Sequence, residues 1–376
     1  MTAEPIDLQR FRDEIVRPDT ALNDEAAARQ KQLITPAGSL GRLETLGAWL
    51  TSVQDQCPPR PLERVRVVVF AGDHGVAARD VSPNPQDVTA QMLRAVVDGR
   101  AAVNALAQTC GATVRVVDMS VATDVPDLPD EVTRYKVRRS TGDIAVEDAM
   151  TADETATAFA AGVAIADAEI DAGADLLIPG DLGVANSTPA ATLIGILSSR
   201  DAGGVTGRGS GIDDEMWIRK AAAIRDAMRR GRPVRGDQLA LVAMVGGPDF
   251  AAMTGFLLQA AVRRTPVVID GLAAAASAML AHRIAYRSSA WWQAAHASDE
   301  PAHALAIARL QLEPLLDYRL QVGEGAGALV AVPLLRAAQA ALADIATFDE
   351  AQVWHPPEPE DEEPEGDAES EEPDED

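Results

Sequence analysis

The stretch LLIPGDLGVANSTPAATLIGIL, residues Leu176–Leu197, decides the fold that we predict for this chain. Its first four residues are apolar, as in a strand that is buried on both faces, and they run into a glycine loop. An alanine-rich segment of helical character follows, in which Thr188 is a natural N-cap and Pro189 a natural first helical residue. The stretch therefore predicts one strand–loop–helix unit of a parallel α/β fold.

The loop in this unit also indicates a ligand. Free backbone N–H groups at the positive end of a helix dipole are what a phosphate monoester needs for binding. An ordinary tight turn between a strand and a helix is the alternative, and the segment alone does not decide between the two.

Other short apolar runs along the chain repeat this pattern. Each ends at a loop with polar residues, and the first of these loops is Gly72-Asp73-His74-Gly75. Ligands of open parallel sheets bind outside the carboxyl ends of the strands, so we expect the functional site among these loops. The four predicted strands are Val65–Phe70, Thr113–Val117, Leu176–Pro179 and Pro266–Ile269.

The two flanks of the chain, Leu8–Gln56 and about Ala302–Phe348, have helical character, and we expect no strand in them. We therefore expect a parallel, Rossmann-like sheet domain and a smaller helical domain that is built from both chain ends. The expected division is residues 1–58 for the N-terminal helical part, 59–300 for the α/β domain, 301–355 for the C-terminal helices with the loop around Glu324, and 356–376 for a disordered acidic tail.

The charge of the chain narrows the class of its partners. The 33 Lys and Arg residues face 58 Asp and Glu residues, a net charge of −25, which argues against nucleic-acid binding and against docking on an anionic membrane. A small neutral or anionic substrate fits better. The tail Pro356–Asp376 holds 13 of the acidic residues and is either a solubilising spacer or a docking segment for a basic partner.

The cellular compartment follows from what the sequence lacks. Two cysteines, Cys57 and Cys110, are too few for a disulfide framework, and the N-terminus has no apolar segment of a signal peptide. No run of about 18 apolar residues predicts a membrane span. We expect a cytoplasmic protein.

A second glycine cluster lies at Thr206–Glu215, TGRGSGIDDE, with Lys220 downstream. It lacks the last glycine of GxGxxG, and no GKS or GKT follows any glycine loop, so neither a standard dinucleotide fingerprint nor a Walker A site is present. The cluster has the donors to surround an anion, and a flexible loop is the equal alternative.

A third cluster, Gly323-Glu324-Gly325-Ala326-Gly327, sets a carboxylate between glycines. Its neighbours give Glu324 little cover, so that a flat ligand can approach the oxygens closely. Partial desolvation would raise the pKa of Glu324 toward the range of a general base. The alternative is a helix N-terminal residue that complements the helix dipole.

The histidines suggest a metal site, but the local sequence argues against it. His296, Glu300 and His303 are spaced by four and three residues, but Ser298 is a good N-cap, so we expect the helix to begin after His296 and the three not to share a face. We expect neither a metal nor a cofactor. His74, at a strand end, either contacts substrate or stabilises its turn.

Taken together, these segments resemble the nicotinate-nucleotide:dimethylbenzimidazole phosphoribosyltransferase family. Gly180–Ala191 (GDLGVANSTPAA) is similar to the family's GEMGIGNTTPAA, and Val322–Ala328 (VGEGAGA) is similar to LGEGSGA. Further segments that resemble family motifs, in the family's order, are Thr35–Glu44, Phe70–Val76, Val81–Met92, Gly207–Glu215, Val245–Met253, Pro266–Gly271 and the HxSxE of His296, Ser298 and Glu300.

The resemblance implies transfer of phosphoribose from nicotinate mononucleotide to a benzimidazole, with inversion at C1 of the ribose, in cobalamin lower-ligand synthesis. It also implies a homodimer and assigns the role of general base to Glu324. Two alternatives stay open, a catalytically silent nucleotide-binding regulator and the same transfer to another azole or purine base.

The resemblance implies roles for further residues. Ser82 and Gln91 would sit at the benzimidazole pocket, together with His74 as a candidate. Asp181 stands where the family has glutamate, and the shorter side chain bears on whether this carboxylate acts directly. The phosphoribosyl pocket would be lined by Gly180, Asp181, Gly183, Asn186, Ser187, Thr188, Gly207, Gly209, Gly211 and Lys220.

Overall fold

A single parallel sheet organises the chain, of which the computed structural model describes residues 6–354. The strands follow the order β2-β1-β3-β4-β5-β6, and every neighbouring pair is parallel. The acidic tail predicted at 356–376 lies outside the described residues. The strands are β1 Val65–Gly72, β2 Thr113–Ser120, β3 Leu176–Leu182, β4 Val267–Ile269, β5 Trp292–His296 and β6 Pro314–Leu316.

The predicted fold class is confirmed, and β1 to β4 are the four predicted strands. Strands β5 and β6 were not predicted. The first, WQAAH, is poor in β-branched residues, and the second is three residues long and starts with proline, so neither carries the usual strand signal. The expectation of a strand-free C-terminal flank is therefore wrong, because Pro314–Leu316 extends the sheet beside β5.

The strand order creates a natural place for a ligand. After β1 the chain first adds β2 on one side of it and then crosses to add β3 on the other side. In doubly wound sheets, the crevice at such a reversal lies beyond the carboxyl ends of the strands. The loops that follow β1 and β3 flank this crevice.

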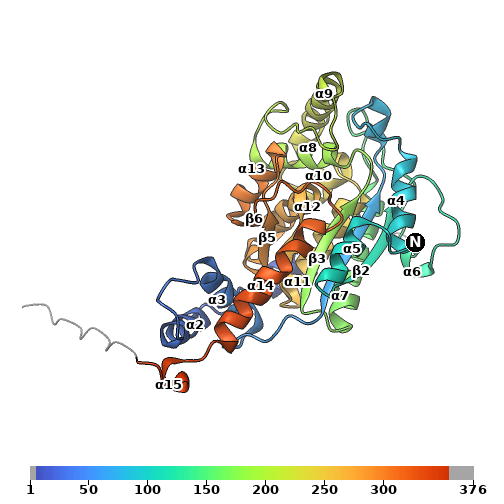
Figure 1. Cartoon of the computed structure of the whole chain (residues 1–376). Helices are drawn as coiled ribbons and strands as arrows, with labels where there is room; N and C mark the ends of the chain where they lie inside the picture. The colour runs from blue at the N-terminus through green and yellow to red at the C-terminus, as the bar shows by residue number, and fades with distance from the viewer. Residues whose placement is uncertain (1–5, 355–376) are drawn as a thin grey trace, which may run out of the picture.

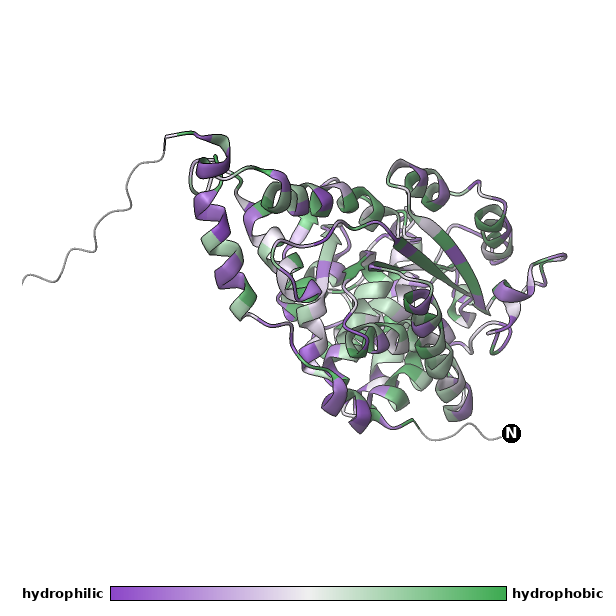
Figure 2. Cartoon of the chain, turned by 90° about the horizontal axis from the view of Figure 1, so that it is seen from below, coloured by the Kyte–Doolittle hydropathy of each residue, from purple (hydrophilic) through white to green (hydrophobic). Residues whose placement is uncertain are grey.

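Helices cover both faces of the sheet (Figure 1), with α5 and α14 in front of the strands in that view and α11 and α12 behind them. Figure 2 shows that apolar residues gather in the sheet and the helices packed on it. The longer helices are α2 Ala21–Gln32, α3 Arg42–Gln54, α4 Asp87–Val97, α5 Ala102–Thr109, α7 Ala152–Asp171, α8 Ser187–Ser198, α9 Asp214–Gly231, α10 Gln238–Val245, α11 Pro248–Val262, α12 Gly271–Ile284, α13 Pro301–Leu310 and α14 Ala326–Asp344. Short helical segments are α1 Leu8–Glu14, α6 Asp130–Thr133, α15 Phe348–Ala351, η1 Gly75–Arg79, η2 Arg232–Val234 and η3 Tyr286–Trp291.

Helices α2 and α3 from the N-terminal part of the chain lie beside the C-terminal helix α14, as the blue and red helices of Figure 1 show. The Arg29 guanidinium in α2 donates to the carbonyls of Leu342 (2.7 Å) and Ala343 (3.1 Å) at the end of α14. Leu33 and Thr347 form an isolated antiparallel bridge. These contacts join helices from both chain ends beside the sheet. The domain boundaries themselves stay a prediction.

One helix among the described residues, α14, is long and apolar enough to cross a membrane by length and composition alone. More than half of it is buried inside the protein, where it packs against α3, α5 and β5. We interpret α14 as a core helix.

The start of α8 differs from the sequence prediction. The helix begins at Ser187, so that Asn186 takes the position before it, and the prediction of Thr188 as N-cap is wrong by two residues. The Asn186 side chain does not cap the helix, because it donates to the Asp181 carboxylate instead. Thr188 is fully buried, and its hydroxyl has no partner among the described residues.

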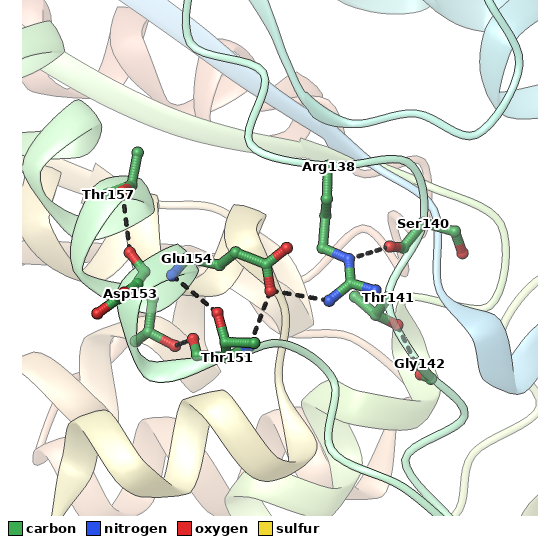
Figure 3. Close-up of polar contacts among 9 residues, drawn as sticks. Arg138, Ser140, Thr141, Gly142, Thr151, Asp153, Glu154 and Thr157 are labelled. Atoms are coloured by element: carbon green, nitrogen blue, oxygen red, sulfur yellow. Dashed lines mark hydrogen bonds and ion pairs between the residues drawn. The ribbon is translucent and has the colours of Figure 1, made fainter. Parts of the chain in front are cut away.

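A capping box fixes the start of α7, the helix that leads the chain back to β3 (Figure 3). Thr151 Oγ1 accepts from the Glu154 N–H (3.2 Å), and the Glu154 carboxylate accepts from the Thr151 N–H (2.8 Å). Arg138 joins this box to the segment before it through Glu154 Oε2 (3.0 Å) and the carbonyl of Ser140 (2.6 Å). The neighbouring Thr141 hydroxyl accepts from Gly75 N at the start of η1, so this segment also contacts the loop that follows β1.

We expect Thr151→Ala to lower the free energy of unfolding by about 1 kcal/mol, because the cap of α7 is lost. Thr157→Ala is the matched control, since Thr157 lies in the same helix and its hydroxyl donates to the carbonyl of Asp153. Urea denaturation of both variants checks this. An equal effect of the two substitutions would contradict the role of the capping box.

Candidate active site

A cavity of about 350 Å³ opens at the carboxyl ends of the strands. Its walls come from the loops that follow β1, β3, β4, β5 and β6, together with α4 and the second glycine loop. Segments far apart in the sequence therefore meet where the parallel sheet predicts a ligand site. The cavity is the candidate active site.

The structure places eight of the site residues predicted from sequence in the wall of this cavity. The predicted residues that line the cavity are Ser82, Asp181, Gly183, Asn186, Ser187, Gly209, Lys220 and Glu324. The predicted residues that are not among its lining are His74, Gln91, Gly180, Thr188, Gly207 and Gly211. Sequence reasoning missed Thr89, Met92 and Leu320–Val322, although the last segment directly precedes the glycine-flanked Glu324.

Glu324 is a buried carboxylate in the wall of this cavity. Its side chain is 4% exposed, and Oε2 accepts from the N–H of Val103 (3.3 Å) in the first turn of α5. Burial raises the pKa of Glu324, the Val103 hydrogen bond opposes this, and the charge of Asp270 adds to the rise. The carboxylate is therefore held in place while it becomes a better proton acceptor at neutral pH.

Asp270 fixes the loop that carries Glu324. It follows β4 and is fully buried, and its two oxygens accept from Gly325 N (3.1 Å) and Ala328 N (2.8 Å) at the start of α14. Asp270 thus satisfies free N–H groups at the start of α14. Glu324 does not cap α14, whose N-cap is Gly325. Its carboxylate lies instead at the N-terminus of α5, so the helix-dipole alternative considered from sequence stays open for that helix.

The same loop approaches β3 closely. Glu324 N donates to the carbonyl of Asp181 (3.1 Å), and a Cβ at Gly180 would lie 2.3 Å from the Glu324 carbonyl carbon. Only glycine at position 180 leaves room for this contact. Gly180 therefore acts on the cavity through the Glu324 backbone, although its own atoms do not line it.

Asp181 is a second acidic group in the wall. Burial, together with the charges of Asp270 and Asp249, raises the pKa of Asp181 to about 7. Its carboxylate accepts from the Asn186 amide, which opposes the rise. Near neutral pH, Asp181 is therefore divided between its acid and its carboxylate form.

Lys220 supplies the buried positive charge. It comes from α9, is 1% exposed, and its Nζ donates to Ser187 Oγ (3.0 Å) and to the carbonyl of Gly207 (3.1 Å). Burial lowers the pKa of Lys220, whereas the charge of Glu300 raises it. An ammonium beside the N-terminus of α8 has the charge and geometry that suit an anionic group such as a phosphate.

Comparisons with known proteins point to one family. A family model described as Phosphoribosyltransferase matches residues 15–353. The nicotinate-nucleotide–dimethylbenzimidazole phosphoribosyltransferase of Mycobacterium marinum is 55% identical to this chain, over 90% of this chain and 94% of that protein. The protein with the same name from Mycobacterium tuberculosis is 54% identical, over 89% of this chain and 92% of that protein. The chain belongs to the nicotinate-nucleotide–dimethylbenzimidazole phosphoribosyltransferase family. A solved structure of the enzyme with this name from Thermus thermophilus is similar, with a TM-score of 0.84, 39% identity, and coverage of 90% of this chain and 100% of that one.

Two residues that were candidates for contact with the base lie outside the cavity lining. His74 is fully buried, and its Nε2 lies 3.2 Å from Asp249 Oδ2. Neither ring nitrogen of His74 has a hydrogen-bond partner among the described residues, so the turn-stabilising hydrogen bonds considered from sequence are not observed. Gln91 is exposed on α4, whereas Val88, Thr89 and Met92 of the same helix line the cavity.

The histidines at the end of β5 and in α13 lie near Asp270, the residue whose carboxylate accepts from the N–H groups at the start of α14. The helix α13 begins after His296 as predicted, but Glu300, not Ser298, takes the N-cap position. Ser298 Oγ hydrogen-bonds to His303 Nδ1 (2.8 Å), and His296 Nε2 lies 3.4 Å from Asp270 Oδ1. Burial lowers the pKa of His296, and the hydrogen bond and charge of Asp270 outweigh it, so that the net change is a rise. Within residues 6–354, no group of three or more potential ligands could hold a metal ion.

A larger cavity of about 990 Å³ lies at the amino ends of the strands. Arginines (Arg17, Arg64, Arg264) and acids (Glu63, Asp175) line it together, and it contains none of the predicted site residues. Proteins of this fold class bind ligands at the carboxyl ends of the strands, so the larger volume of this cavity does not make it the candidate active site.

We expect Asp181→Asn to stabilise the protein more at pH 8 than at pH 5. The pKa of Asp181 is about 7 in the folded state, above its ordinary value of 3.8, so ionisation costs stability as pH rises through about 7. Asparagine cannot ionise and escapes this cost. Urea denaturation at the two pH values measures the difference.

Asp317→Asn, in an exposed loop, is the control and should show no such dependence. A stability difference between Asp181→Asn and the unmodified protein that stays constant from pH 5 to pH 8 would contradict the account of Asp181.

Proposed function

We propose that this chain transfers the phosphoribosyl group of nicotinate mononucleotide to 5,6-dimethylbenzimidazole, with Glu324 as the general base. The products are α-ribazole 5′-phosphate and nicotinate. The observation that carries the proposal is the buried Glu324 carboxylate in one cavity with the buried Lys220 ammonium. One group suits proton removal and the other suits a phosphate.

The reaction balances without a further reactant. One benzimidazole nitrogen attacks C1 of the ribose, and the proton on the other nitrogen passes to the Glu324 carboxylate. The bond from C1 to the pyridinium nitrogen breaks, and its electron pair neutralises the ring, which leaves as nicotinate. Attack from the face opposite the leaving group inverts C1 from β to α. The protein contributes alignment and proton removal.

The lining of the cavity fits this division of tasks. Apolar side chains of Val88, Met92 and Leu320 lie in the wall and suit a flat aromatic ring. Ser82 lines the cavity too and offers a hydroxyl to a ring nitrogen. We propose that the base binds at these residues and that the phosphate binds near Ser187 and Lys220.

Glu324→Gln should lower turnover at least about 100-fold, which is the lower end of the usual contribution of a general base. The amide has nearly the same shape, so the unfolding transition should change little. Glu215→Gln, an exposed residue in α9, is the control for the loss of one carboxylate. Product formation is measured by mass spectrometry with nicotinate mononucleotide and 5,6-dimethylbenzimidazole.

The pH dependence of turnover in the unmodified protein gives a second test of the role of Glu324. A carboxylate accepts a proton only when ionised, so turnover should rise with pH through the raised pKa of Glu324, above the ordinary glutamate value. Near-normal turnover in a folded Glu324→Gln variant would remove Glu324 from the role of base.

We also propose that the chain acts as a homodimer in the cytoplasm, and the support for both is the family to which it belongs. Sedimentation equilibrium should give twice the mass of the 39.6 kDa chain. A mass of one chain at micromolar concentration would contradict the dimer.

A further inference from the structure

The carboxylate of Glu300 is a buried acidic group of the cavity to which the proposed reaction gives no task. It is 9% exposed and lies directly before α13, but its side chain does not cap that helix. Oε1 instead accepts from the N–H of Gly209 in the second glycine loop (2.7 Å). The ordinary structural reason for an acidic residue at a helix start therefore does not account for Glu300.

The glycine loop is shaped around this carboxylate. A Cβ at Gly207 would lie 2.0 Å from Glu300 Oε2, so only glycine at position 207 leaves space for the oxygen. Glu300 lines the candidate active site, and its Oε2 is buried and has no hydrogen-bond partner among the described residues. An ionised oxygen in such a place is costly unless a donor reaches it.

The chemistry of the donor follows from the charge of Glu300. A carboxylate only accepts hydrogen bonds, so it repels the phosphate and the carboxylate of nicotinate mononucleotide. Lys220 bonds to Ser187 and Gly207, and it supplies the charge for the phosphate. The neutral donors that remain in the phosphoribosyl group are the ribose hydroxyls.

We propose that Glu300 Oε2 accepts a hydrogen bond from a ribose hydroxyl and makes the site selective for ribosyl over deoxyribosyl ligands. Oε1 stays bonded to Gly209, which leaves the second oxygen for the ligand. A site that is built to bond a hydroxyl rejects the analogue that lacks it, because its buried polar group is then left unpaired. This inference deepens the proposed function, since it rests on a phosphoribosyl group in this cavity.

Calorimetric titration with ribose 5-phosphate, 2-deoxyribose 5-phosphate and 3-deoxyribose 5-phosphate tests the proposal without any transfer reaction. The unmodified protein should bind ribose 5-phosphate about 10- to 100-fold more tightly than at least one deoxy sugar, the range for a hydrogen bond to a charged group. In Glu300→Ala this ratio should fall to near one. Loss of a negative charge near the phosphate changes all affinities together and leaves the ratio unaffected.

A second variant and a control keep the outcome clear. Glu300→Gln preserves the shape and an acceptor for Gly209 N, and its ratio should lie between those of the unmodified protein and Glu300→Ala. Asp299→Asn removes the adjacent carboxylate, which contacts Gln321 and does not line the cavity, and should keep the full ratio.

Two results would overturn the proposal. One is an equal weakening of all three sugar phosphates in Glu300→Ala, which would show that Glu300 only holds the glycine loop. The other is a protein that binds ribose 5-phosphate no better than both deoxy sugars. Failure of base transfer with the ratio intact would instead count against the proposed function alone.

Discussion

The clamp that Asp270 places on the start of α14 is the constraint on which the candidate site depends. Its two oxygens take the N–H groups of Gly325 and Ala328, and Glu324 is held just before them with a φ of 61°. A left-handed backbone is costly for a residue with a side chain, and such strain persists only where surrounding contacts fix it. Two further features hold the Glu324 backbone in this conformation: the Asp181 carbonyl accepts from Glu324 N, and Gly180 has no side chain that would clash with the Glu324 carbonyl. The sheet thereby sets the position of a side chain that lies two residues before the start of α14, far along the chain.

The electrostatics of the cavity follow from crowding acids around one buried lysine. Asp181, Glu300 and Glu324 share the wall with Lys220, and the fully buried Asp270 lies close by. Burial and the charges of neighbouring acids raise the pKa of Glu324 above its ordinary value and the pKa of Asp181 to about 7, so both carboxyl groups bind a proton more readily than an exposed one. The cost in stability is accepted at a functional site, where such groups are needed.

Much of the fold could be predicted because its signals are local. The β-branched strands and the glycine-flanked Glu324 stand out in the sequence alone, and so does the place of the site beyond the strand ends. Strand β5 could not be found this way, because its sequence WQAAH has no β-branched residue and two alanines, and its extended conformation depends on pairing with the neighbouring strands. The cap of α8 and the partner of His74 were missed for a related reason: Asn186 bonds to Asp181 and His74 faces Asp249, and both contacts cross between elements. Glu300 was considered only as a metal ligand and as part of a family motif, since its contact with Gly209 spans two distant loops.

A crystal structure with the benzimidazole and the phosphoribosyl product bound tests the central claim most directly. The account predicts a ring nitrogen within about 3.2 Å of a Glu324 oxygen, the reach of a general base, and the phosphate beside Lys220. A ring bound with its nitrogens facing away from Glu324, or a phosphate remote from Lys220, would contradict it.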